Sequence, residues 1–307
     1  MRRRTCTVST CWRSGIIPDA RELVDALHEA GADSLELEFR IKSGTFEEIR
    51  KNRKEWGVKI TSLHAVCPSP KGKGRGAEAH LISDENEDAR KKGVEDIRTT
   101  LRNAAEVEAG AVVIHAGRVP MDEPFYIMMN MYDNGSKDSP RWHEFLHAVM
   151  LERMSKSKRS FSQTLKSLEE INEEAVKLGI NVGVENRYYF GEMPNIDEFG
   201  VIFNTFDGGR LHYWHDVGHA HVQEVLYGTP QRVMLETFGD RLIGVHLHDV
   251  QGGYTDHNEP GSGAVDFKMI KRYLKPDTIK VVELNQRVSQ EELKRGIDYL
   301  ADVGILV

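Results

Sequence analysis

The residues from Leu242 to Phe267, LIGVHLHDVQGGYTDHNEPGSGAVDF, show in one stretch a pattern that recurs along the whole chain. A short apolar run is followed by histidines and aspartates and then by a glycine-rich loop. This order is typical of a buried strand that delivers polar side chains at its C-terminal end. His246 and His248 are two residues apart, so a strand points both to the same side. Imidazoles in such a place need partners, which we looked for in the rest of the chain.

Length and charge limit the classes of protein to consider. A chain of 307 residues can form two ordinary domains or one large α/β domain, since closed α/β barrels reach this size undivided. Hydrophobic residues make up 39% of it, enough for a sizeable core. The formal charge of −7 argues against a nucleic-acid backbone as the main partner, although a local basic patch stays open.

Cysteine usage and the N-terminal segment bear on location. Cys6, Cys11 and Cys67 are odd in number and lack the paired spacing of a zinc knuckle or a disulfide scaffold. This pattern favours a reducing, cytoplasmic setting. The segment TCTVSTCW behind Arg2–Arg4 is too short and polar for a secretory signal. No apolar run approaches the roughly 20 residues that cross a bilayer, so we expect no membrane association.

Apolar, β-branched runs alternate with helical patterns from end to end. We expect strands over Thr5–Cys11, Asp33–Arg40, Lys59–Ala65, Ala111–Gly117, Ile180–Asn186, Leu211–Val217, the run from Leu242, and Thr278–Leu284. We expect helices between Pro18 and Gly31 and over Thr45–Trp56, Asp84–Ala109, Phe161–Leu178, Ile196–Phe203 and Ser289–Leu300. In the second strand Leu35, Leu37 and Phe39 alternate with Glu36 and Glu38.

Eight such strands in alternation with helical patterns predict an α/β fold of the (β/α)8 TIM barrel type, one domain over residues 1–307. An open, doubly wound sheet is the alternative. Against it, no Gly-x-Gly-x-x-Gly turn follows the first strand and no Gly-Lys-Ser/Thr phosphate loop occurs. Methionine-rich residues 118–160 break the rhythm after strand four, and we interpret them as an insertion over the top face, a lid or an oligomer contact.

Polar residues end six consecutive strands of this prediction. They are His64, His115, Glu185, Asp216, His246 and Glu283. In a barrel the C-terminal ends of the strands converge on one face. A buried polar or ionised group costs several kcal/mol unless it is paired, so these side chains need a common partner. A divalent metal ion is the simplest one, because carboxylates and neutral imidazoles are its usual ligands.

The six residues differ in how strongly they point to a metal. A carboxylate inside a valine run, such as Glu185 or Glu283, is seldom an ordinary polar contact, so we assign Glu185, Asp216, His246 and Glu283 as the ligand set. For His64 and His115, direct ligation and an ordinary polar contact both stay open.

The remaining histidines fall into three groups. His219 and His257 can reach the mouth as outer ligands or substrate contacts. His248 and Asp249 are candidates for orienting His246. His212, His215 and His221 are expected to cap helices or face solvent.

An ordered set of motifs resembles a known family. The motifs are SLHA and VIHAG at the ends of strands three and four, VEN at Glu185, DVGHAH from Asp216, VHLHD followed by HNEPGSGAVDF, and VEL at Glu283. Each is weak alone, but the set, in this order from about residue 60 to 284, resembles the xylose isomerase-like barrels. That superfamily includes sugar-phosphate isomerases and epimerases and endonuclease IV.

The resemblance implies one catalytic divalent ion, manganese, zinc, cobalt or magnesium, held by Glu185, Asp216, His246 and Glu283. It also implies that the two glutamates act as acid and base on opposite sides of a sugar carbon. His219 matches a histidine that contacts substrate in the epimerases or binds a further zinc in the nuclease.

The same resemblance leaves the number of metal ions open. His64 and His115 match two nuclease zinc ligands, which leaves open a second metal shared through Glu185. One departure puts a three-metal cluster in doubt, because Thr255 stands where the nuclease has an aspartate two residues before the match of His257, with Asp256 shifted by one.

We therefore expect a metal-dependent isomerase or epimerase that converts a small sugar, polyol ketone or sugar phosphate through an enediolate. A dehydratase-type lyase, an endonuclease for abasic DNA and a sugar-binding barrel without catalysis are the alternatives. Specificity is expected in residues 66–83 and 118–160 and in Arg187 and Tyr188, from which the substrate cannot be named. We also expect a homo-oligomer, a dimer or a tetramer.

Overall fold

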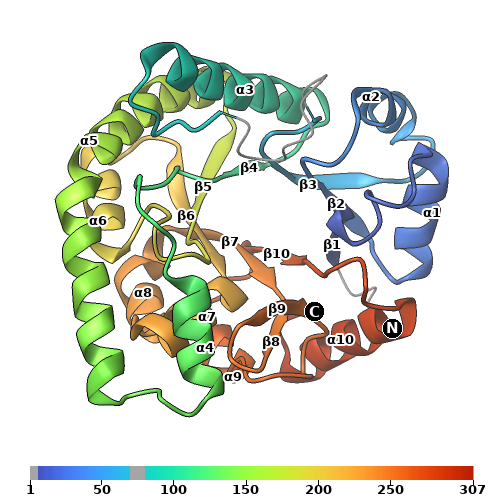
Figure 1. Cartoon of the computed structure of the whole chain (residues 1–307). Coiled ribbons are helices and arrows are strands. Elements are labelled where there is room, and N and C mark those ends of the chain that lie inside the picture. The colour runs from blue at the N-terminus through green and yellow to red at the C-terminus, as the bar shows by residue number, and fades with distance from the viewer. Residues whose placement is uncertain (1–5, 70–79, 307) are drawn as a thin grey trace.

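The computed structural model describes residues 6–69 and 80–306. Eight parallel strands close into a barrel in the order β1-β10-β7-β6-β5-β4-β3-β2, with the helices around it (Figure 1). The strands are β1 (Thr7–Ser9), β2 (Ser34–Leu37), β3 (Lys59–His64), β4 (Ala111–Ile114), β5 (Asn181–Glu185), β6 (Leu211–Asp216), β7 (Leu242–Leu247) and β10 (Ile279–Val282). Because β1 pairs with both β2 and β10, the predicted barrel is confirmed and the open sheet is excluded.

Helices and one hairpin fill the connections between the strands. The helices are α1 (Ala20–Glu29), α2 (Ser43–Asn52), α3 (Glu87–Glu106), α4 (Phe125–Asp133), α5 (Pro140–Leu178), α6 (Ile196–Thr205), α7 (Val217–Tyr227), α8 (Gln231–Phe238), α9 (Phe267–Lys271) and α10 (Gln290–Val303). An antiparallel hairpin of β8 (Asp249–Gln251) and β9 (Thr255–Asn258) follows β7. Among the described helices none is both long and apolar enough to span a membrane.

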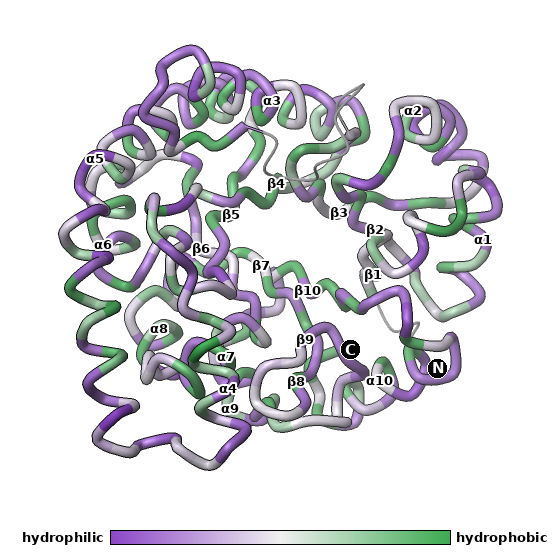
Figure 2. Tube along the Cα trace, viewed as in Figure 1, coloured by the Kyte–Doolittle hydropathy of each residue, from purple (hydrophilic) through white to green (hydrophobic). Residues whose placement is uncertain are grey.

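One predicted helix begins far earlier than its sequence pattern suggested. The helix predicted from Phe161 starts at Pro140, where the Ser139 side chain caps it by accepting a hydrogen bond from the Trp142 backbone N–H. The helical spacing of buried residues is hard to recognise in this part of the sequence because some apolar residues are exposed. Met150 and Met154 face outward, with 47% and 71% of their surface exposed. Hydrophobic and hydrophilic segments alternate along α5 in Figure 2, as the helix turns one face to the barrel.

The strands are apolar on both faces, as expected in a parallel barrel. Their outward residues join the large core under the helices, and a smaller cluster of Ala111, Val113, Trp214 and Val281 fills the interior. Trp214 needs glycine neighbours, because a Cβ on Gly244 would lie 2.0 Å from its Cζ3. The indole packs edge-on beneath His246, with ring centroids 5.2 Å apart, and so forms part of the floor of the site.

Two predictions fall partly on residues outside the described ranges. The loop 66–83, expected to meet the substrate, includes residues 70–79, and Arg2–Arg4 also lie outside the described ranges. The described cysteines are Cys6, Cys11 and Cys67, all of them buried free thiols, as their spacing suggested.

Candidate functional site

The C-terminal ends of four neighbouring strands bring the predicted ligand set together. Glu185 ends β5, Asp216 ends β6, His246 lies in β7 and Glu283 follows β10. Each offers a donor atom, and these atoms all lie within 4.8 Å of one another. All four residues are buried. The convergence predicted from the strand ends is therefore present.

One imidazole nitrogen stands at the centre of this cluster. His246 Nδ1 lies 2.6 Å from Glu185 Oε1, 3.1 Å from Glu283 Oε2 and 3.7 Å from Asp216 Oδ2. A ring nitrogen carries at most one hydrogen, so it cannot satisfy three carboxylates at once. The cluster has an excess of acceptors.

Glu36 is a member of the cluster that sequence reasoning missed. Its carboxylate has no exposed surface, lies 3.1 Å from His246 Nε2 and accepts a hydrogen bond of 2.7 Å from Ser62 Oγ. By holding Nε2, it turns Nδ1 of His246 towards the other carboxylates. A usable signal was present, because both faces of a parallel barrel strand are covered, so a glutamate between Leu35 and Leu37 must point into the barrel.

A side-chain amide holds two of the ligands in register. Asn186 accepts a hydrogen bond of 2.9 Å from the Asp216 backbone N–H and donates one of 2.9 Å to the Asp216 carbonyl oxygen. Asp216 in turn caps α7, since its Oδ1 accepts from the His219 backbone N–H at 2.7 Å. The ends of β5 and β6 are thereby tied together, which fixes Glu185 beside Asp216.

The electrostatics keep these carboxylates ionised. Burial alone raises the pKa of Glu185, but Arg187, His115 and His246 outweigh it and hold that pKa well below its usual range. Burial likewise raises the pKa of Asp216, and His219, His248 and His246 bring it well below normal. Ionised carboxylates are what a metal ion requires.

The donor set fits a divalent cation. Four carboxylates, those of Glu36, Glu185, Asp216 and Glu283, are buried around His246. Buried charge of one sign is costly unless a counter-charge is present. Three carboxylates and one imidazole suit manganese, zinc, cobalt or magnesium. The residues present therefore fit the metal that the ligand set predicts.

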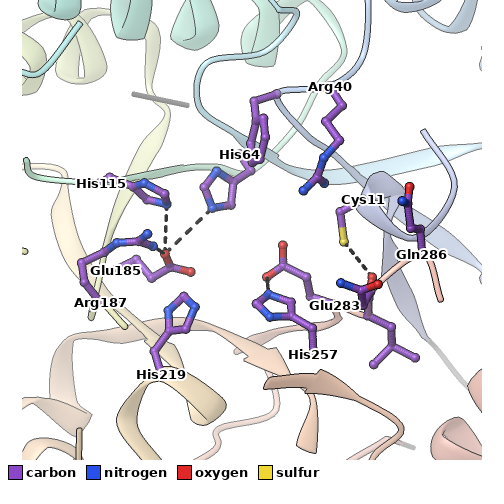
Figure 3. Close-up of a pocket in the computed structure, with 13 residues that line it drawn as sticks. Cys11, Arg40, His64, His115, Glu185, Arg187, His219, His257, Glu283 and Gln286 are labelled. Atoms are coloured by element: carbon purple, nitrogen blue, oxygen red, sulfur yellow. Dashed lines mark hydrogen bonds and ion pairs between the residues drawn. The ribbon is translucent and has the colours of Figure 1, made fainter. Parts of the chain in front are cut away.

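His64 and His115 both approach the other oxygen of Glu185. His115 Nε2 lies 3.3 Å and His64 Nε2 3.9 Å from Glu185 Oε2 (Figure 3). Burial and the neighbouring His115 lower the pKa of His64 to about 4, so this ring is neutral at pH 7. The Arg187 guanidinium contacts the same Oε2 atom and also lies 3.3 Å from Glu192 Oε1. A cation already stands where His64, His115 and Glu185 would share a second metal.

The histidines of α7 and the β8–β9 hairpin form a second group with Asp216. Donor atoms of Asp216, His219, His248 and His257 lie within 4.8 Å of one another. His248 was predicted to orient His246, and this is wrong. Its Nε2 donates to Asp216 Oδ1 at 2.9 Å, while its Nδ1 accepts from the His257 backbone N–H at 2.9 Å. His248 therefore orients Asp216 and anchors the hairpin.

Asp249 and His215 also differ from their predictions. Asp249 does not orient His246; its carboxylate accepts hydrogen bonds from the backbone N–H groups of Val250, Gly261 and Val265 and shapes the glycine-rich loop. His215 was expected to cap a helix or face solvent, but it is fully buried with its Nδ1 2.5 Å from the Tyr213 hydroxyl. Its strand, β6, is covered on both faces.

Asp256 lies in the site despite its shifted sequence position. Its Oδ2 is 3.7 Å from His219 Nε2 and 3.0 Å from His257 Nδ1. Asp256 and His257 are both in β9 of the hairpin, and the backbone at His257 is left-handed, with a φ of 56°. The group therefore has a second carboxylate beside that of Asp216, although Thr255 stands at the expected position.

A cavity of about 320 Å³ opens above the cluster. Seven of the predicted residues line it: His64, His115, Glu185, Arg187, His219, His257 and Glu283. Asp216 and His246 lie beneath it with no exposed surface. Arg40 and Gln286 form a side of the cavity away from Arg187, and sequence reasoning missed both (Figure 3).

The chain matches one family over most of its length. Residues 24–303 match the sequence profile of the xylose isomerase-like TIM barrel. The chain is 27% identical over 194 residues to the uncharacterized protein MJ1311 of Methanocaldococcus jannaschii, which covers 62% of this chain and 55% of the relative. It is 25% identical over 232 residues to MJ1614 of the same organism, covering 72% of each. The chain thus spans little more than half the length of MJ1311.

Solved structures share the fold over nearly the whole chain. A D-tagatose 3-epimerase-like protein superposes with a TM-score of 0.71 at 20% identity, covering 97% of this chain and 96% of that one. The 3-keto-D-glucoside 4-epimerase YcjR from E. coli gives 0.68 at 18% identity, covering 97% and 98%. The IolI protein with a zinc atom gives 0.66 at 12% identity, covering 97% of each. At such identities these likenesses establish the fold.

Proposed function

Because this chain belongs to the xylose isomerase-like TIM barrel family, we propose that it is a metal-dependent isomerase or epimerase of a ketose, a polyol ketone or their phosphates. Its fold is shared with a protein named D-tagatose 3-epimerase-like, with a 3-keto-D-glucoside 4-epimerase, and with IolI, which holds a zinc atom.

One observation carries the proposal. Glu185 and Glu283 approach the same His246 nitrogen from different strands, at 2.6 Å and 3.1 Å, and both line the cavity. Two ionised carboxylates on one cavity can exchange protons with a substrate carbon placed between them. A purely structural cluster has no need to expose two carboxylates to the same cavity.

The bound ion, the two glutamates and the cavity histidines would have separate roles in this reaction. When bound by Glu185, Asp216, His246 and Glu283, a divalent ion would polarise the substrate carbonyl and stabilise the negative charge that develops on it. One ionised glutamate removes the proton from the neighbouring carbon, and the other, after it has taken up a proton from solvent, returns one. Return to the opposite face of that carbon gives the epimer, and return to the next carbon gives the isomer. His219 and His257 face the cavity and can donate to substrate hydroxyls.

Deuterium exchange tests this proposal directly. The purified protein is analysed for metal and then incubated in D2O with ketoses, ketose phosphates and inososes. We expect deuterium at the carbon beside the carbonyl, detected by NMR, and a loss of more than about 100-fold in Glu185→Gln and in Glu283→Gln. Absence of exchange by the metal-loaded protein across the panel would reject the proposal. An enone absorbance without exchange product would indicate a dehydratase.

A second candidate is hydrolysis of abasic DNA, favoured by the position of Asp256 beside His219 and His257. The net charge of −7 weighs against binding to DNA. Nicking of an abasic duplex, with the steep salt dependence of phosphate contacts, would support this candidate over the first.

We also propose that the chain forms a dimer or a tetramer and is located in the cytoplasm. Residues 118–160 include α4, whose Phe125 packs against Tyr188 at 5.1 Å between ring centroids, while Asp133 accepts from the Tyr254 hydroxyl at 2.7 Å. These contacts suit a lid, and exposed Met154 suits an oligomer contact. Sedimentation velocity tests the predicted dimer or tetramer, and cell fractionation tests the predicted cytoplasmic location.

A further inference from the structure

A second cavity of about 460 Å³ adjoins the first. It lies among the segment after β1, the start of α1 and the start of α2, and Arg40 lines both cavities. The first cavity, above the predicted ligand set, lies at the low end of the roughly 300–1,000 Å³ range of small-molecule sites. The two cavities together offer room for a ligand larger than one sugar ring.

Three residues form the boundary between the cavities. A Cβ placed on Gly15 would lie 3.0 Å from Gln286 Oε1 and 3.8 Å from Arg40 Cδ. Gln286 belongs to the first cavity and Gly15 to the second. Gly15 and the Gln286 side chain therefore approach closely where the two cavities adjoin, and a larger residue at position 15 would displace Gln286. The backbone at Gly15 has no positive φ that would require glycine.

The boundary is held in place by a buried carboxylate. Glu38 has no exposed surface, accepts a hydrogen bond of 3.0 Å from Arg40 Nη1 and also accepts one from Ser14 Oγ. The Arg40 guanidinium lies over the Phe39 ring, 4.6 Å from its centroid. On the other side, Arg13 donates to the Gln286 carbonyl oxygen at 2.8 Å. The boundary between the cavities, over which a ligand would cross Arg40, therefore has a defined geometry.

The lining of the second cavity suits a sugar ring. Ile17, Pro18 and Ile41 give it an aliphatic wall, and Ile16 nearby is 56% exposed. Lys42 and Arg40 add hydrogen-bond donors. A pyranose has a C–H face that packs on aliphatic side chains and hydroxyls that accept from such donors.

We propose that the second cavity binds the distal sugar of a substrate in which the reacting ketose is joined to another sugar. This inference rests on the function proposed above and deepens it, since it names glycosides of disaccharide size as the substrate class. Arg40 and Gln286 then contact the linkage between the two sugars.

Binding measurements that need no turnover test the inference. Zinc-loaded protein is titrated with fructose and with the ketose disaccharides lactulose, maltulose and isomaltulose, followed by saturation-transfer NMR. We expect at least one disaccharide to bind at least tenfold more tightly than fructose. Equal or weaker binding of all three disaccharides would overturn the inference.

Bulky substitutions at the boundary and in the second cavity supply the structural control. Gly15→Leu places a side chain at the boundary, and Thr45→Trp fills the second cavity from another wall, so one variant remains informative if the other fails to fold. Each is expected to weaken disaccharide binding at least tenfold. Gly44→Leu introduces the same side chain as Gly15→Leu, but into open space, and should leave the binding of fructose and of the disaccharide unchanged. An equal loss for fructose and disaccharide in both cavity variants would overturn the inference.

The two proposals fail in different ways. If a disaccharide binds selectively but no deuterium exchange occurs, the cavity assignment stands and the isomerase or epimerase is rejected. If fructose binds and exchanges but no disaccharide binds more tightly, the reaction stands and the second site is rejected. If neither fructose nor a disaccharide binds, the second site is rejected, and the exchange panel alone decides the reaction.

Discussion

Nε2 of His246 lies 3.1 Å from Oε1 of Glu36, although the two residues are 210 positions apart in the sequence. Both side chains are fully buried inside the barrel. Since His246 Nε2 faces Glu36, only Nδ1 is directed to the carboxylates of the cluster. The orientation of the nitrogen that we propose as a metal ligand is therefore set by a residue on β2, across the barrel interior.

Replacing Glu36 by glutamine tests this relationship. Glu36→Gln keeps the shape but removes the charge that holds the His246 ring, so we expect the affinity for zinc to fall by about 10–100-fold. Competition with a chelator of known affinity measures this. Ser62→Ala removes only the hydrogen bond from Ser62 Oγ to Glu36 and should have a smaller effect. Unchanged zinc affinity in Glu36→Gln would contradict the positioning role.

Arg187 is predicted to limit the number of ions that the site accepts. Its guanidinium contacts the Glu185 oxygen that His64 and His115 also approach. We expect the native chain to bind one zinc ion and Arg187→Ala to bind two, because the variant removes a positive charge from the place of a second ion. Equilibrium dialysis followed by elemental analysis counts the ions. Two ions bound to the native chain would show that Arg187 does not exclude the second.

The ligand set could be predicted because each member ends an apolar run. Glu185, Asp216, His246 and Glu283 needed only the strand assignment and the geometry of a barrel to be brought together. The residues that support them carry no such mark. Glu36 sits in SLEL, a pattern that also suits a half-exposed strand, and only closure of the barrel shows that it points inward.

Features that depend on loop backbone were harder to predict. Asp256 is one position away from the expected carboxylate, and it lies beside His219 because of the conformation of the β8–β9 hairpin. Arg40 follows β2 and Gln286 follows β10, and both line the same side of the cavity, which nothing in their local sequence indicates. Spacing in sequence gives the faces of strands, but not the path of the connections.

Gly244 is predicted to be essential for packing under the site. In Gly244→Ala the new methyl group would meet Trp214 at 2.0 Å, and such overpacking costs about 1–3 kcal/mol of the free energy of unfolding, or more where the ring cannot move. Gly200→Ala on α6 meets nothing within 4 Å and should instead stabilise by up to about 1 kcal/mol. Urea unfolding measures both. A Gly244→Ala variant as stable as the native chain would show that the indole can shift freely.

Glu38 makes stability depend on pH. Burial raises its pKa to about 7, partly offset by Arg40 and Ser14, whereas an unfolded glutamate titrates near 4.5. Below pH 4.5 the carboxyl is protonated in both states, and as pH rises towards 7 the folded protein must bury a charge that the unfolded chain exposes. The free energy of unfolding of the native chain relative to Glu38→Gln should therefore fall between pH 4.5 and 7, by on the order of 3 kcal/mol. Urea unfolding of both proteins across this range measures the difference, with Glu48→Gln on the exposed face of α2 as the reference for removing a charge. A difference that stays constant or grows with pH would mean that Arg40 and Ser14 compensate fully for the burial of this carboxylate.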